Sequence, residues 1–69
     1  MDLSLVVELE ADGRWIAEVP ELPGVMVYGA TEAEAMAKAE VLALRVLADR
    51  IEHAETAPLP VRISLPNAA

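Results

Sequence analysis

The chain has 69 residues and no cysteine, so it forms one domain at most (residues 1–69) and offers neither a disulfide nor a thiolate metal site. Its formal net charge is −7, and an acidic surface repels phosphate backbones, which argues against direct nucleic-acid binding. Hydrophobic residues make up 55% of the sequence, more than a small monomer buries easily, so we expect a homo-oligomer, either a dimer or a tetramer.

The first residues lack the basic region and apolar run of a signal peptide, and no apolar stretch approaches the roughly 18 residues that span a bilayer. We therefore expect a cytoplasmic protein without membrane contact.

Three short strands are predicted in the first 30 residues. Apolar residues occupy alternate positions from Leu3 to Leu9, a period typical of a strand with one buried face. The Asp12-Gly13 pair that follows is a strong hairpin signal, and residues 14–19 form the return strand. Residues 25–28 read as a third strand, so short connections favour an antiparallel meander.

The segment Pro20-Glu21-Leu22-Pro23-Gly24 separates the second and third strands. Proline lacks an N–H and has a fixed φ, so two prolines within four residues exclude a central strand. Gly24 gives the backbone the freedom to change direction. We expect a stiff corner here.

A long helix is predicted next. Thr31 and Glu34 form a capping box, in which the threonine hydroxyl accepts from an early helical N–H and the glutamate accepts from the threonine N–H. From residue 32 to about residue 54 the chain lacks Gly and Pro and is rich in strong helix formers. Such a helix is roughly 34 Å long, enough to cross a small sheet.

This helix has two apolar sides. At about 100° per residue, one side carries Ala35, Met36, Ala39, Ala43, Val46 and Leu47, and we assign it to the sheet. A sheet face covers one side of a helix, so the opposite side needs a second layer. We predict that it mediates self-association through Val41, Leu44, Ala48 and Ile51. The alternative is that the C-terminal segment folds over this side.

After the helix, residues 56–60 read as an extended connector, residues 61–65 alternate like a fourth strand, and the last residues form a tail. The predicted fold class is α+β, with the order β-β-β-α-β: a small antiparallel meander, a fourth strand, and one long helix packed on one face.

The sequence carries no pattern of a catalytic, cofactor or metal site, and we do not expect an enzyme. His53 is the only histidine, and its place late in the helix suits the helix dipole. Carboxylates gather on or near the hairpin and are interpreted as a solvated, partner-facing rim rather than a Mg²⁺ site of a degenerate nuclease. We assign Glu8, Glu10, Glu18 and Glu21 to this rim.

The order of these features resembles the HicB antitoxin family, over about residues 3–50. The resemblance is carried by the proline–glycine corner and by the glycine, threonine and Glu-Ala that open the helix, namely Pro20, Leu22, Pro23, Gly24, Gly29, Thr31 and Glu34. Val25 stands where many members have cysteine, which we interpret as a packing change.

The resemblance implies a partial ribonuclease-H-like fold that does not use the nuclease carboxylates. It also implies a function, which is to bind a small basic mRNA-cleaving HicA-type toxin and cover its active site. Many members carry a further DNA-binding domain, which these 69 residues do not contain, so operator binding is not expected. The alternative is a stand-alone oligomeric HicB-like module without a toxin partner.

Overall fold

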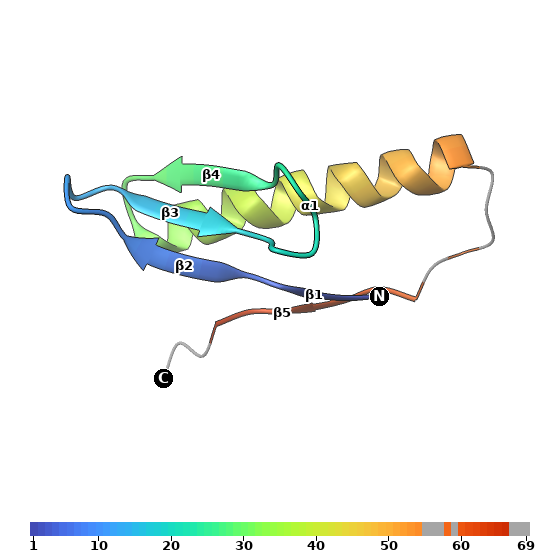
Figure 1. Ribbon diagram of the computed structural model, residues 1–69, viewed down its shortest axis with the longest axis horizontal. Helices are drawn as coiled ribbons and strands as arrows, with labels where there is room; N and C mark the ends of the chain where they lie inside the picture. Colours follow the sequence, from blue (N-terminus) through green and yellow to red (C-terminus); the bar gives the residue numbers. More distant parts are fainter. Residues whose placement is uncertain (55–57, 59, 67–69) are drawn as a thin grey trace.

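The structure, a computed structural model, describes residues 1–54, 58 and 60–66 (Figure 1). Five strands and one helix follow in the order β1 (Asp2–Ser4), β2 (Val6–Leu9), β3 (Trp15–Glu18), β4 (Met26–Gly29), α1 (Glu32–Ala54) and β5 (Arg62–Ser64). The predicted α+β class and the single long helix are confirmed. Residues 56, 57 and 59 of the predicted connector and residues 67–69 of the predicted tail lie outside the described residues.

Strands β2, β3 and β4 form the predicted antiparallel meander, and α1 packs on one face of it (Figure 1). Ala17 in the central strand pairs with Val7 on one side and Val27 on the other. Ala17 is fully buried, so this row faces the helix. Because side chains alternate along a strand, Ile16 and Glu18 face away from the helix.

The predicted first strand is divided at Leu5, which corrects the sequence analysis. Its second part, β2, pairs with β3, whereas its first part, β1, pairs in parallel with β5 in the register Leu3↔Ile63. The inward alternation nevertheless continues through the division, because Leu3 and Leu5 are both buried. The fourth predicted strand is therefore present as β5, and it forms a two-stranded parallel sheet with β1, separate from the meander (Figure 1).

Small side chains set the contact between α1 and the sheet. Ala35, Ala39 and Ala43 recur every four residues and are completely buried, and Leu47 continues the same stripe at 3% exposure. Residues four apart lie on one face of a helix, so this stripe lets the helix backbone approach the strands closely. The side of α1 assigned to the sheet from the sequence is confirmed for these four residues and for Val46, which is partly buried against the core, whereas Met36 is half-buried and lies outside the core cluster.

The corner and the helix start hold the two ends of β4. Leu22 is 1% exposed and anchors the corner, whose turns bond Leu22 N–H to Val19 O (2.9 Å) and Val25 N–H to Leu22 O (3.1 Å). Gly24 takes a φ of 90°, in the left-handed region that favours glycine. At the other end, a Cβ on Gly29 would lie 2.6 Å from Ala35 N, so this position requires glycine.

The capping box differs from the prediction by one residue. Glu34 N–H donates to Thr31 Oγ1 at 3.0 Å as expected. The Glu34 carboxylate, however, accepts from Ala30 N–H at 3.1 Å rather than from Thr31 N–H. The first bond satisfies an early helical amide, and the second ties the residue before the cap to the first turn of the helix.

The molecule is elongated, with principal extents of 42 × 23 × 15 Å. Its Cα radius of gyration is 12.9 Å, against roughly 11 Å for a compact domain of this length. The last turns of α1 extend beyond β3 and β4 (Figure 1). Within the described part of the chain, no helix combines the length and apolarity needed to cross a membrane.

Candidate protein-binding site

The face of the meander that points away from α1, called here the outer sheet face, mixes acidic and large apolar side chains. Strand register gives two rows, which are Val6–Glu18–Met26 and Glu8–Ile16–Tyr28. The apolar members are unusually open, since Val6, Met26 and Tyr28 are 38%, 54% and 40% exposed. Exposed apolar side chains interspersed with one sign of charge are typical of a protein-binding surface.

Three of the four predicted partner-facing acids share this face. Glu8 and Glu18 lie on neighbouring strands, and Glu10 follows β2 at a position of the same alternation. Among the described residues, none of these three carboxylates forms an ion pair with a cation of the chain. Their negative charge is therefore available to a basic partner.

Glu21, the fourth predicted acid, lies elsewhere and has a partner within the chain. Its carboxylate accepts from Ser4 N–H and from Ser4 Oγ, both at 2.9 Å. These bonds, the backbone N–H foremost, and the N–H of Glu21 itself lower the pKa of the carboxyl group. The side chain thus closes the edge of β1 that faces away from β5, which is a structural role that the sequence analysis missed.

Arg14 contributes a cation at the rim of the outer sheet face that sequence analysis also missed. Its guanidinium stacks 4.2 Å from the centre of the Tyr28 ring and its Nε donates to Asp12 Oδ2 at 2.7 Å. Hydrogen bonds from the backbone and side chain of Arg14 lower the pKa of Asp12. Because Arg14 is already engaged by both residues, the face keeps its acidic character.

The second apolar side of α1 is open. Val41 and Leu44 are 48% and 49% exposed, Ala48 is exposed, and Ile51 is half-buried. The alternative that the C-terminal segment covers this side is wrong for its described part, because β5 lies beside β1 instead. The four predicted self-association residues therefore form one largely exposed stripe, called here the outer helix face.

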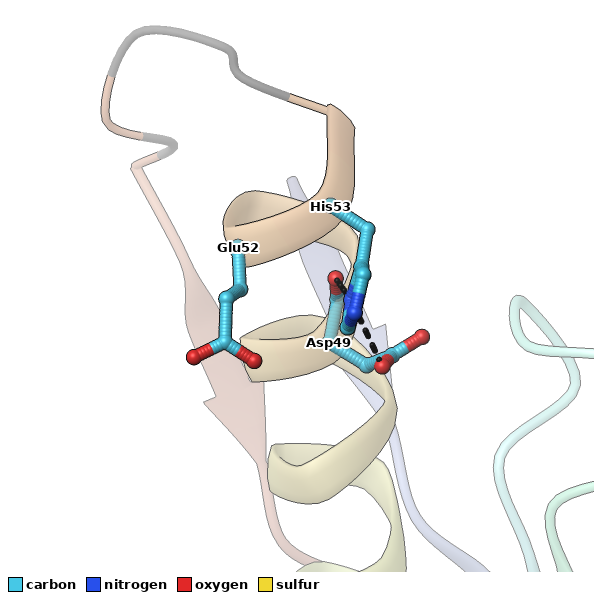
Figure 2. Close-up of side chains that lie close together, drawn as sticks. All are labelled: Asp49, Glu52 and His53. Carbon is cyan, nitrogen blue, oxygen red and sulfur yellow. Dashed lines mark hydrogen bonds and ion pairs between the residues drawn. The ribbon is translucent and has the colours of Figure 1, made fainter.

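Three possible metal ligands gather near the end of α1 (Figure 2), and all are exposed. Asp49, Glu52 and His53 offer ligand atoms within 4.8 Å of one another. His53 Nδ1 lies 2.9 Å from Asp49 Oδ1 and 3.0 Å from the Asp49 backbone oxygen. These two oxygens already contact Nδ1, so a metal ion could bind this nitrogen only by displacing both contacts. The spacing i, i+3, i+4 would have identified this cluster in the sequence.

The described residues form neither an enclosed pocket nor a cluster of buried polar groups. An open pocket of about 150 Å³ lies beside the β1–β5 pair, lined by Met1, Asp2, Pro60, Val61 and Arg62. Small-molecule sites usually exceed about 300 Å³ and enclose their ligand. The described residues also include no buried polar or charged side chain. The outer sheet face and the outer helix face are consequently the strongest candidates for function.

Comparison of the chain with protein-family models, curated proteins and solved structures finds no match. The resemblance to HicB antitoxins therefore rests on the motif residues. In the structure, these residues shape the corner and join β4 to α1: Leu22 is buried, Gly24 has a positive φ, Gly29 contacts the helix backbone, and Thr31 and Glu34 cap the helix.

Proposed function

We propose that the chain is a HicB-like antitoxin module that binds a small basic HicA-type mRNA-cleaving toxin and masks it by protein–protein contact. In this proposal the module acts in the cytoplasm, as an interaction protein without catalysis of its own. The observation that carries the proposal is the outer sheet face, where three carboxylates without an ion pair among the described residues share one surface with exposed Met26 and Tyr28 of β4. The motif resemblance supplies the identity of the partner.

The two kinds of side chain on this face would contribute differently to binding. Carboxylates attract a basic partner over distance, which raises the association rate and makes it salt-dependent. Met26 and Tyr28 are 54% and 40% exposed, and burying them would contribute most of the affinity, because apolar and aromatic side chains dominate interface energetics. The proposal therefore predicts complex formation that weakens with salt and depends on both groups.

The test is co-expression of the tagged chain with a HicA-type toxin encoded beside it, followed by affinity measurement. Glu8→Lys/Glu18→Lys reverses two charges on the outer sheet face. Glu40→Lys/Glu52→Lys makes the same change in net charge on α1 and serves as the matched control. We expect the first pair to weaken toxin binding by about tenfold or more at physiological salt and the control pair to leave it nearly unchanged.

The proposal fails if the two variants bind the toxin equally well, or if purification from the native host yields the chain without a small basic partner. If no such partner exists, co-expression of the chain would also fail to relieve a toxin's arrest of translation. A fold check by circular dichroism on both variants separates loss of binding from loss of structure.

The second candidate function is a stand-alone oligomeric HicB-like module, and the outer helix face favours it. Val41 and Leu44 expose about half of their surface on a helix that extends past the sheet. Leu44→Glu/Ile51→Glu should give a folded species of lower mass by light scattering, because charges cannot be buried unpaired in an apolar interface. Arg45→Glu changes the net charge equally on the polar side and should keep the parent mass. Equal masses for all three proteins would exclude this interface.

A further inference from the structure

We propose that β5 is a self-pairing edge, through which two copies of the chain join antiparallel, β5 to β5, around a twofold axis at Ile63. The β1–β5 pairs of the two copies would then form one four-stranded sheet in the order β1–β5–β5–β1, with both helices on the same side. This interface is separate from the outer sheet face and the outer helix face, so it goes beyond the function proposed above.

The first observation is the direction of the backbone groups in β5. Arg62 N–H donates to Met1 O at 2.9 Å, and Ser64 O accepts from Leu5 N–H at 3.1 Å, so residues 62 and 64 point toward β1. Backbone groups alternate along a strand, which directs those of Val61, Ile63 and Leu65 to the open side. Within the described part of the chain, these outward groups have no backbone partner.

The second observation is where the prolines lie. Pro60 and Pro66 flank β5. Like residues 62 and 64, they stand at even-numbered positions, whose backbone groups are directed toward β1. Proteins commonly protect an open edge with prolines, whose missing N–H prevents pairing. Here the prolines leave the outward donors of Val61, Ile63 and Leu65 intact. The edge is therefore competent to pair along its full length.

Strand β4, the outer edge of the three-stranded sheet, provides a contrast. Val19 N–H donates to Val25 O, so residues 25, 27 and 29 point toward β3 and residues 26, 28 and 30 point outward. Met26 N–H is already bound to Gly24 O, and Ala30 N–H is bound to Glu34 Oε1. This edge is closed at both ends by its own turn and by the helix cap, whereas the β5 edge is open.

The third observation is that β5 is complementary to itself. An antiparallel pair centred on Ile63 sets Val61 of one copy opposite Leu65 of the other, and these residues are 38% and 59% exposed in the single chain. Each outward N–H and C=O then meets a partner group. Arg62, the charged residue of β5, lies opposite Ser64 of the second copy, so like charges are not placed face to face. These properties identify a second copy as the occupant.

The first test is disulfide trapping, which is unambiguous because the natural chain has no cysteine. Arg62→Cys/Ser64→Cys places thiols at directly opposed positions of the proposed pair, where Cα atoms of antiparallel strands lie about 4.5 Å apart, within disulfide range. We expect mild oxidation to convert most of this variant to a covalent dimer. Each single substitution faces a non-cysteine residue and should crosslink far less, as should Met26→Cys/Tyr28→Cys on the β4 edge.

The second test uses charge and is carried out in the Leu44→Glu/Ile51→Glu background, which removes self-association through the outer helix face. Val61→Glu/Leu65→Glu opposes carboxylates at both ends of the β5 pair and should yield the 7.4 kDa monomer by light scattering. Val61→Lys/Leu65→Glu opposes unlike charges in the same register and should remain a dimer that weakens with salt.

The proposal is overturned if the background variant is already a monomer, if both charge variants have the same mass, or if the single cysteine variants crosslink as fast as the double one. None of these outcomes bears on toxin binding by the outer sheet face, which is measured separately. Circular dichroism on every variant verifies that a change in mass is not a loss of fold.

Discussion

Both sides of α1 are apolar in sequence, yet one is buried against the sheet and the other is largely exposed. The buried stripe on the sheet side is made of Ala35, Ala39, Ala43 and Leu47, none more than 3% exposed. The outer helix face carries larger residues, of which Val41 and Leu44 are about half exposed. Side-chain size distinguishes them, because a helix that packs closely on a sheet needs small residues at the contact.

The difference shows what an apolar stripe does and does not specify. It indicates that a surface is suited to burial, but not whether the cover comes from the same chain. In this molecule the described strands cover one side of α1, and the other side has the composition of an interface. The following experiments test how firmly the inner contact is fixed and whether the outer one tolerates change.

The largest effect is expected at Gly29, where β4 meets the start of α1. Gly29→Ala would bring a Cβ 2.6 Å from Ala35 N and 2.9 Å from Ala35 Cα, and because both atoms are backbone the helix must shift. We expect a loss of about 3 kcal/mol in unfolding free energy, measured by urea denaturation. Gly13→Ala is the control, since it meets no atom within 4 Å and is expected to cost about 1 kcal/mol, from its φ of 90° alone. Equal losses would show that the close approach at Gly29 is not made.

Ala39→Leu and Ala48→Leu compare the two sides of α1 directly with one substitution. Ala39 is completely buried against the sheet, so a larger side chain should cost about 2 kcal/mol through overpacking. Ala48 is exposed, and the same change there should alter the unfolding free energy by less than about 0.5 kcal/mol. A large loss at Ala48 would mean that the outer helix face is tightly covered in solution, which would break the comparison.

Thr31→Ala tests how much the cap at the start of α1 contributes to stability. It removes the acceptor of Glu34 N–H, and the loss of such a helix cap costs about 1 kcal/mol. Thr31→Ser retains the hydroxyl and should recover most of the stability. If alanine and serine behave alike in thermal unfolding, the helix start is held by Gly29 and Ala35 rather than by the cap.

The sequence predicted the meander, the corner and the helix because each depends on local signals. Each of these signals involves only neighbouring residues: the alternation from Leu3 to Leu9, the Asp12-Gly13 turn and the capping Thr31. The division at Leu5 was missed because alternation continues through it, while the pairing partner changes from β5 to β3. Such a change depends on which strands meet in space, and no local pattern of β1 or β2 records it.

Those parts of the candidate site that depend on local alternation were also predictable from the sequence, whereas contacts between distant residues were not. Glu8, Glu10 and Glu18 reach one face because strand alternation determines sidedness. The bond of Glu21 to Ser4 was not foreseen, because it joins residues 17 positions apart. The stacking of Arg14 on Tyr28 likewise requires the β3–β4 register, which the corner length does not determine.

The smallest expected effect concerns the exposed Glu34, whose pKa reports its two bonds at the start of the helix. The Ala30 N–H lowers the pKa of this carboxyl group most, and the Lys38 ammonium, 3.2 Å away, lowers it further. Because the folded-state pKa lies below the unfolded one, the resulting stability is complete above the unfolded-state pKa and is lost as pH falls through the folded-state pKa. Lys38→Met should raise the Glu34 pKa part of the way to its ordinary value in a carbon-13 NMR titration, while Lys38→Arg should retain it. A complete return to the ordinary value would mean that the bond to Ala30 depends on Lys38, and that the cap is held in place by this surface ion pair.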